Sequence, residues 1–452
     1  MNEMKDKASK SVAAAEGHVC DCCGTLVKPT DKTIIITMGK GYKLCSNCLE
    51  AIHLQTRASI AKHAEVVSMK QGMHKKLRPS DIKRALDRYI IGQDKAKQVL
   101  SNAVYNHYKM IDMKERGLTD IEMEKSNVCL LGPTGCGKTA MLRALSKFLQ
   151  VPFAISDATS LTSAGFVGAD VETVIRKLVE NAPGETLPQK IEAAEHGIVY
   201  IDEIDKLSRK SENPSITTDP GSEGVQQALL KIIEGSEVEI PPKGQRKHPQ
   251  QKCIKVDTSN ILFIVGGAFE GIEKIIAKRQ HKGKGAIGFG GIGNHSEKDK
   301  TFNDLVLDVK VEDLQKYGMM PEFLGRFPII CPMKQLDEEA LTSILTKPKN
   351  ALVKQYKELF NHDNANLEIS EEALHKIAHV AIERETGARS LRSIMEDLLG
   401  DTMFCLPDHP DVTNVMVDVA EEDGEFIISA TNKNFEEIDI MIDDKEKESV
   451  SA

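Results

Sequence analysis

The chain has 452 residues, which is more than one hydrophobic core ordinarily organises, so roughly two to four domains are expected. A net charge of −9 argues against a protein built mainly to coat nucleic acid, and no apolar run is long enough to cross a bilayer. Residues 1–16 lack the apolar core of a secretory signal, so a cytoplasmic location is expected. Ten cysteines in a chain of this size indicate metal binding and buried thiols, not a disulfide framework.

Four cysteines near the N-terminus form two CxxC pairs, Cys20 with Cys23 and Cys45 with Cys48, with 21 residues between the pairs. Four thiolates at this spacing can close a tetrahedral Zn²⁺ site, and a unit this small needs such a cross-link to fold. Cys22 is a further thiol, and the sequence leaves open whether it competes with Cys23 as a ligand. We therefore predict a zinc-binding domain at residues 1–61 that contacts other proteins, with nucleic-acid binding as the alternative.

A polar linker at residues 62–79 precedes an alternating pattern of helices and short strands that extends over residues 80–335. Ser80 is expected to cap the first of these helices. The β-rich runs are Asn127–Leu131, Pro152–Ser156, Ile198–Asp202, Asn260–Gly266 and Ile329–Cys331. Because strands that alternate with helices pair in parallel, we predict an α/β domain whose parallel sheet is covered by helices on both faces.

Residues 336–432 carry a different pattern, which is mainly helical and ends in two strands. The expected helices are Glu338–Phe360, Glu371–Glu383 and Ala388–Met403. The expected strands, Asn414–Val419 and Glu425–Ser429, flank the hairpin signal Asp423-Gly424. These patterns predict a small C-terminal α+β domain, followed by an acidic, disordered tail at residues 433–452.

The stretch from Gly132 to Thr139 matches the phosphate-binding pattern G-x-x-x-x-G-K-[ST] at every fixed position. Backbone N–H groups of the loop and of the following helix would bind phosphate oxygens. Lys138 would neutralise the β- and γ-phosphates, and the Thr139 hydroxyl would bind Mg²⁺. The predicted nucleotide-binding residues of this stretch are Pro133, Thr134, Gly135, Cys136, Gly137, Lys138, Thr139 and Ala140.

Two carboxylates, Asp202 and Glu203, follow the apolar run Gly197–Ile201. At the carboxyl end of a parallel strand, both side chains would face the nucleotide crevice. Asp202 would hold Mg²⁺ through water, and Glu203 would polarise the water that attacks the γ-phosphate. Together with the phosphate loop, this pair predicts ATP hydrolysis.

An Asp-Glu pair in this position resembles the AAA+ ATPases, and further segments match that family. Pro321–Pro328 resembles the segment that presents an arginine finger, which implies that Arg326 acts on the γ-phosphate of a neighbouring subunit in a homo-hexameric ring. Arg389 matches the sensor-2 arginine of the family's small domain. Tyr89–Gln93, which includes Ile91, resembles the segment that packs on adenine. As bare chemistry, each arginine is also compatible with an ordinary surface ion pair.

A four-cysteine unit ahead of an AAA+ module resembles the Clp/Hsp100 unfoldases, which can feed a separate peptidase. The resemblance implies that Phe166 and Val167 grip the substrate chain in the central channel. It also implies that Arg246, Lys247 and His248 attract substrates at the entrance of the ring. Phe166 replaces the Tyr that is usual in this pore-loop motif. The sensor-1 position of the family has no polar counterpart in the fourth core strand, so no residue is assigned to it.

Ile287, Gly288 and Phe289 match the tripeptide by which such unfoldases dock into apolar clefts of a ClpP-type peptidase. Two large apolar residues in a Gly-rich loop are costly unless a partner receives them. The resemblance therefore implies an ATP-dependent unfoldase and specificity subunit that uses ATP, Mg²⁺ and Zn²⁺. Its implied partners are the peptidase, unfolded or tagged protein substrates, and adaptor proteins.

Two other classes of function stay open. A nucleic-acid motor would share the nucleotide motifs, but the acidic net charge and the few stacking aromatics count against it. A remodelling chaperone that works without a peptidase would use the same motor. A relative such as HslU should share the nucleotide motifs but lack the zinc unit and the docking tripeptide.

Overall fold

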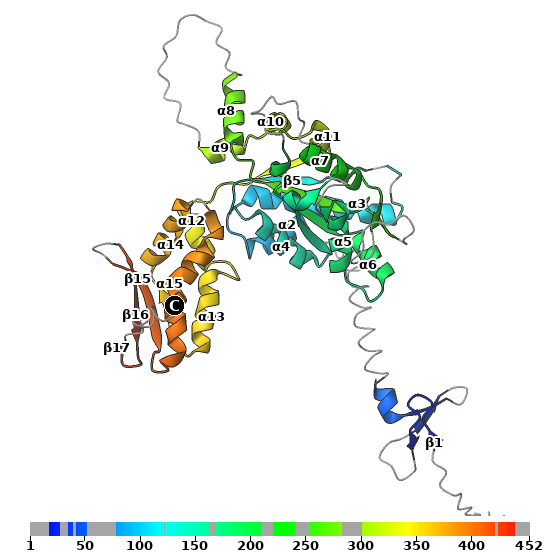
Figure 1. Cartoon of the computed structure of the whole chain (residues 1–452), viewed down its shortest axis with the longest axis horizontal. Coiled ribbons are helices and arrows are strands. Elements are labelled where there is room, and N and C mark those ends of the chain that lie inside the picture. The colour runs from blue at the N-terminus through cyan, green and yellow to red at the C-terminus, as the bar shows by residue number, and fades with distance from the viewer. Residues whose placement is uncertain are drawn as a thin grey trace, which may run out of the picture. The chain divides into compact units, whose positions relative to one another are not determined.

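The computed structural model describes residues 18–27, 35–38, 42–51, 78–118, 120–121, 123–162, 169–208, 220–240, 253–282, 301–384, 386–420 and 424–438. The chain divides into two compact units, Met1–Gly72 and Met73–Ala452, which are drawn in Figure 1. Among the described residues, no helix is both long enough and apolar enough to span a membrane.

The first unit contains two short antiparallel pairs of strands. β1 (His18–Val19) pairs with β2 (Leu26–Val27), and β3 (Ile35–Met38) pairs with β4 (Tyr42–Cys45), which leads into a helical segment at residues 46–51. Among the described residues of this unit, the buried core contains Cys20, Val27, Leu44 and Cys45. Two of these four residues are cysteines of the predicted zinc site, so the core and the predicted site coincide.

A five-stranded parallel sheet forms the centre of the second unit (Figure 1). Its strands lie in the order β13 (Ile329–Pro332), β5 (Val128–Leu131), β12 (Leu262–Gly267), β9 (Ile198–Asp202) and β6 (Phe153–Asp157). All four neighbouring pairs run parallel. The predicted α/β sheet is therefore confirmed, and the five predicted strands differ from the observed ones by two residues at most.

Helices cover both faces of this sheet, because alternate residues of each buried strand point to opposite sides. Val128, Leu130 and Tyr200 pack with α2 (Pro79–Asp87), α3 (Asp94–Glu115) and α4 (Lys138–Leu149). Cys129, Leu131 and Val199 belong to the opposite core with α5 (Glu172–Asn181), α7 (Pro220–Ile233) and α8 (Ile272–Lys282). The remaining elements of this domain are η2 (Ala158–Ser160), β7 (Leu161–Thr162), β8 (Ala169–Asp170), α6 (Leu187–Ala194), η3 (Ile204–Leu207), β10 (Glu237–Ile240), β11 (Ile254–Asp257), α9 (Phe302–Val306), α10 (Val311–Tyr317) and α11 (Pro321–Gly325).

The start of α2 corrects one sequence expectation. The N-cap residue is Arg78, not Ser80, and Pro79 occupies the first helical turn. Proline has no N–H to leave unpaired there, and its fixed φ angle suits the first helical position. The carboxylate of Asp81 accepts a 3.2 Å hydrogen bond from the backbone N–H of Arg78, which completes the cap.

The C-terminal part of the second unit is the predicted small α+β domain. Four helices, α12 (Glu338–Thr346), α13 (Leu352–His362), α14 (Glu371–Glu383) and α15 (Leu391–Cys405), pack on a sheet of strands in the order β14 (Asn366–Ile369), β15 (Asn414–Val419), β16 (Phe426–Thr431) and β17 (Glu437–Ile438). Two short 3₁₀ turns, η4 (Gly387–Arg389) and η5 (Leu406–Asp408), flank α15. β15 and β16 form the predicted antiparallel hairpin.

Two expectations for this domain are wrong in detail. The helix predicted over Glu338–Phe360 is interrupted between α12 and α13 near Pro348, because proline lacks an N–H donor and disfavours a helical residue before it. The tail predicted from residue 433 contains β17, which pairs with β16 through Ile438 and Ala430. A two-residue strand at a sheet edge carries too little pattern for sequence reasoning to find it.

Candidate active site and metal centre

The phosphate loop joins the end of β5 to the start of α4. Gly135 and Gly137 have φ angles of 76° and 98°, in the left-handed region that glycine adopts without steric cost. Gly137 is also the N-cap residue of α4, so the loop ends at the free N–H groups of a helix N-terminus. Such a terminus attracts anions, and the loop therefore has the backbone form that phosphate binding requires.

The side chain of Lys138 bends back over this loop. Its Nζ atom donates hydrogen bonds of 2.6 Å to the carbonyl oxygen of Gly132 and 3.1 Å to that of Pro133. The ammonium group is thus held at the mouth of the loop. Phosphate oxygens can accept the same hydrogen bonds from it as these carbonyl oxygens do.

The carboxylate pair lies at the carboxyl end of β9, next to the phosphate loop. Thr139 donates a 2.8 Å hydrogen bond from Oγ1 to Oδ2 of Asp202. Glu203 follows with a φ angle of 57°, and its backbone N–H donates a 3.0 Å bond to Oδ1 of Asp202. Both oxygens of Asp202 are therefore oriented by protein donors, while the Glu203 side chain stays exposed. A hydroxyl and a carboxylate side by side are oxygen ligands of the kind that Mg²⁺ prefers.

A cavity of about 610 Å³ connects these groups. Arg389 lines it from the small domain, beside Ala388, whose backbone N–H donates a 3.3 Å bond to the carbonyl oxygen of Gly135. The full lining is Thr134, Gly135, Gly137, Lys138, Thr139, Ala140, Asp202, Glu203, Asp205, Lys206, Ala268, Glu270, Ala388 and Arg389. The structure thus brings most of the predicted nucleotide-binding residues, both carboxylates and Arg389 around one cavity.

Asp205 is a cavity residue that sequence reasoning missed. Its side chain is 3% exposed, and its Oδ1 accepts a 3.2 Å hydrogen bond from the backbone N–H of Ala268, just after β12. A Cβ atom on Gly267 would lie 2.6 Å from that oxygen, so the absence of a side chain at the end of β12 makes room for the carboxylate. The signal in the sequence was a third acid three residues after Asp202.

Ile91 is absent from the described lining of this cavity. It lies in the turn between α2 and α3, two residues before the buried Gln93. The side-chain amide of Gln93 donates to the carbonyl oxygens of Lys334 (2.7 Å) and Cys136 (3.5 Å), and its Oε1 accepts from the N–H of Lys334 (3.0 Å). Gln93 therefore connects the predicted adenine segment to the phosphate loop and to the chain that leads into the small domain.

Arg326 lies away from this cavity. It directly follows α11 and lines a different cavity of about 640 Å³, together with Asn127 and Glu234. Its carbonyl oxygen accepts a 3.0 Å hydrogen bond from Nδ2 of Asn127, the residue immediately before β5. The phosphate loop begins at the other end of this four-residue strand, roughly 13 Å further along.

Comparison with protein families settles the class of this site. Residues 123–330 match the AAA domain (Cdc48 subfamily), and residues 336–411 match the C-terminal, D2-small domain, of ClpB protein. The first match contains the phosphate loop, Asp202, Glu203 and Arg326, and the second contains Arg389.

These two domains indicate a Clp/Hsp100-type AAA+ ATPase. Proteins of this type use ATP and Mg²⁺, typically assemble as hexameric rings, and act as ATP-dependent unfoldases or chaperones. The geometry around Lys138, Thr139 and Asp202 fits that pair of cofactors, because it offers a cationic loop beside a set of oxygen ligands.

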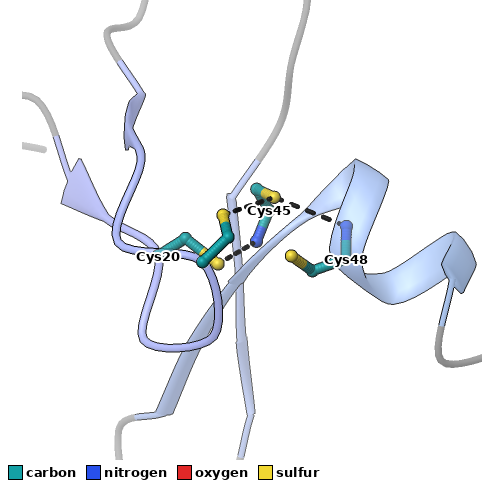
Figure 2. A group of neighbouring side chains, drawn as sticks. Cys20, Cys45 and Cys48 are labelled. Carbon is teal, nitrogen blue, oxygen red and sulfur yellow. Dashed lines mark hydrogen bonds between the residues drawn. The ribbon is translucent and has the colours of Figure 1, made fainter.

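The N-terminal unit of this AAA+ ATPase carries the four predicted cysteines in one cluster. The sulfur atoms of Cys20, Cys23, Cys45 and Cys48 all lie within 4.8 Å of one another (Figure 2). The Sγ atoms of Cys23 and Cys45 are 3.8 Å apart. Four thiolates at a Zn–S distance of 2.3 Å in a tetrahedron would be separated by about 3.8 Å, so the donor set fits zinc.

Backbone hydrogen bonds favour a thiolate at Cys20, whereas side-chain hydrogen bonds with Cys23 and Cys45 raise the pKa of the Cys48 thiol. The backbone N–H of Cys45 donates to Sγ of Cys20 over 3.3 Å, and that of Cys48 donates to Sγ of Cys45 over 3.4 Å (Figure 2). Backbone hydrogen bonds from Cys23 and Cys45 lower the pKa of the Cys20 thiol to about 6. Cys22 is exposed and is not one of the four clustered sulfur atoms, which favours the predicted ligand set.

Three groups of predicted residues of the AAA+ ATPase lie outside the described part of the chain. They are the pore-loop pair Phe166 and Val167, the entrance residues Arg246, Lys247 and His248, and the docking tripeptide Ile287, Gly288 and Phe289. Their functions remain predictions from the sequence.

Proposed function

We propose that this ATPase is a ClpX-type unfoldase, which recognises folded proteins, unfolds them and passes them to a ClpP-type peptidase. The observation that carries this choice is the cluster of Cys20, Cys23, Cys45 and Cys48 in a separate unit ahead of the ATPase module. The sequence motifs at residues 287–289 and 246–248 support the same choice. Four thiolate ligands also suit a reducing compartment such as the cytoplasm.

In the proposed hydrolysis step, Lys138 and the loop N–H groups bind the phosphates of ATP. Thr139 and Asp202 would hold Mg²⁺, and the ion would supply positive charge to the phosphates. Glu203 accepts a proton from the attacking water, since its side chain is exposed to the cavity. Arg389 contacts the bound nucleotide from the small domain and thereby relates nucleotide state to the position of that domain.

We further propose that Arg326 acts on the ATP of the neighbouring subunit. Its separation from the phosphate loop of its own chain by the length of β5 supports a role in trans. Its presence in a different cavity from Lys138 supports the same conclusion. An arginine supplied in trans stabilises charge that develops on the transferred phosphoryl group.

The test is degradation of a folded, tagged substrate by the full-length protein with a purified ClpP-type peptidase. Wild type should degrade the substrate only with ATP. Glu203→Gln should bind ATP but neither hydrolyse it nor unfold the substrate. Deletion of residues 287–289 should abolish degradation while ATPase and unfolding rates stay unchanged. Persistent degradation after that deletion would refute the docking assignment.

A ClpB- or ClpA-like unfoldase is the second candidate, because residues 336–411 match the small domain of ClpB. A ClpB-like protein would remodel substrates without passing them to a peptidase. Recovery of active protein from aggregates, with no stimulation of degradation by the peptidase, would favour it.

A further inference from the structure

Arg326 has a buried support that the family motifs do not include. Asn127 is 2% exposed and donates a 3.0 Å hydrogen bond from Nδ2 to the carbonyl oxygen of Arg326. The Oδ1 atom of the same side chain accepts a 3.1 Å bond from the backbone N–H of Phe263, at the start of β12. One side chain therefore connects the main chain of Arg326 to two strands of the central sheet.

Asn127 lies directly before β5, where the parallel ladder of the sheet begins. The next residue, Val128, pairs with Ile264 on one side and with Ile329 on the other. The Asn127 amide thus links the start of β5 to β12 and to the carbonyl oxygen of Arg326, which lies three residues before β13. Phe263 is fully buried, so loss of the Asn127 acceptor would leave its N–H group unpaired.

Asparagine also has the chemistry that the position needs. The N–H of Phe263 can only donate and the carbonyl of Arg326 can only accept, so the bridging group must do both. An amide does so in one plane, whereas an aspartate carboxylate could accept from Phe263 but would repel the carbonyl oxygen. The two partners also determine which way the amide points.

The guanidinium group of Arg326 has a separate partner. Its Nη2 atom lies 2.7 Å from Oε1 of Glu234, just after α7, and both side chains are about 45% exposed. An ion pair this exposed is weak and can exchange for another anion. The carbonyl group of Arg326 is thus bound by Asn127, while its guanidinium group stays exposed and can bind another anion.

We propose that Asn127 is a positioning residue for Arg326, and that it connects the strand leading to one subunit's phosphate loop with the arginine that completes the site of the next subunit. The inference rests on the proposed action of Arg326 in trans. Because a misplacement of about 1 Å can cost 100-fold in rate, loss of the Asn127 bond should lower kcat by roughly 10- to 100-fold. Binding of ATP should be unaffected.

A complementation experiment with full-length rings tests the proposal. Asn127→Asp keeps the acceptor for Phe263 and replaces the bond to Arg326 with repulsion, whereas Asn127→Leu loses both bonds. Each variant is mixed with Glu203→Gln subunits, which cannot hydrolyse ATP but carry an intact Arg326. In randomly mixed rings with equal amounts of the two subunits, about a quarter of the sites combine an intact Glu203 with an intact neighbouring arginine. Arg326→Ala, mixed in the same way, is the reference.

If the inference holds, both Asn127 variants are nearly inactive alone, and ATPase activity rises on mixing, as with Arg326→Ala. If Arg326→Ala is rescued and the Asn127 variants are not, Asn127 acts within its own subunit and the inference is wrong. Full activity of either Asn127 variant alone would also overturn it. If Arg326→Ala itself is not rescued, the proposed action in trans fails and the inference falls with it.

Thr258→Val is the matched control. Thr258 is fully buried, and its hydroxyl donates to the carbonyl oxygen of Ile232 (2.7 Å) and accepts from the N–H of Ser236 (3.0 Å). This variant removes a comparable buried bridge from the segment that carries Glu234 and leaves the hydrogen bond between Asn127 and the main chain of Arg326 intact. Its activity should not rise on mixing with Glu203→Gln subunits. Ring assembly and thermal unfolding of each variant, measured alone, separate loss of folding from loss of positioning.

Discussion

The hydroxyl of Thr139, at the start of α4, lies 2.8 Å from the carboxylate of Asp202, at the end of β9. Two residues that lie 63 positions apart in the sequence thus present adjacent oxygen ligands. This contact orders both groups before nucleotide binds, so little rearrangement is needed to form the Mg²⁺ site.

We expect Thr139→Val to lower kcat for ATP hydrolysis by at least roughly 100-fold, because valine keeps the shape but cannot bind the metal or Asp202. Thr139→Ser retains the hydroxyl and should stay within about tenfold of wild type. Steady-state hydrolysis across a Mg²⁺ titration checks both expectations. Equal activity of the valine and serine variants would show that the hydroxyl has no role.

Removal of zinc should unfold the N-terminal unit and leave the ATPase module folded. Among the described residues of the unit, four apolar ones form the buried core, and two of these are the predicted zinc ligands Cys20 and Cys45. Cys48→Ser should lose the bound zinc, whereas Cys22→Ser should keep one zinc per chain. Metal analysis and limited proteolysis check this, and equal zinc loss in the two variants would contradict the ligand set.

The free energy of unfolding should decrease as the pH falls below neutral, because of His107. Burial of the ring, together with the charge of Lys125, lowers the pKa of His107 to about 3, and Nε2 lies 3.1 Å from the carbonyl oxygen of Asn260. The unfolded chain takes up a proton near pH 6.5 while the folded chain does not, so stability decreases as pH falls through that value.

At pH 5 this group alone should cost about 2 kcal/mol of unfolding free energy relative to neutral pH. His107→Gln keeps a donor for Asn260 but does not titrate, so its stability should depend less on pH between 5 and 7. Urea unfolding of both proteins at the two pH values measures the difference. Parallel pH profiles would refute the assignment.

Breaking the buried ion pair of Arg279 and Asp313 should lower the free energy of unfolding more than replacing both residues with apolar ones. Asp313 is fully buried, and both of its oxygens accept from Nε of Arg279, at 2.9 and 3.1 Å. Asp313→Ala removes the buried partner of the guanidinium, which keeps its contacts with the more exposed Asp308, and should destabilise the domain by up to about 3–5 kcal/mol. The double variant Arg279→Met with Asp313→Leu should be more stable than Asp313→Ala. Denaturant unfolding of the three proteins checks this order.

The parts of the fold that were predictable share one property, which is that their signal is local. The five strands and the phosphate loop follow from short apolar runs, glycines and a lysine within a few residues of one another. The CxxC pairs likewise carry the ligand set within two short segments. The break at Pro348 and the strand β17 were missed, because a long helical pattern hid the first and the second has only two residues.

The sequence by itself therefore determined the chemistry of this protein: Lys138, Thr139, Asp202 and Glu203 appear in motifs whose residue types and spacing leave few alternatives. Only the tertiary structure decided how Arg326 is held. Its partners, Asn127 and Glu234, are 199 and 92 residues away along the chain. In the same way, Asp205 reaches the end of β12 because Gly267 has no side chain there. Such contacts depend on how strands and helices pack, and no local pattern of residues encodes them.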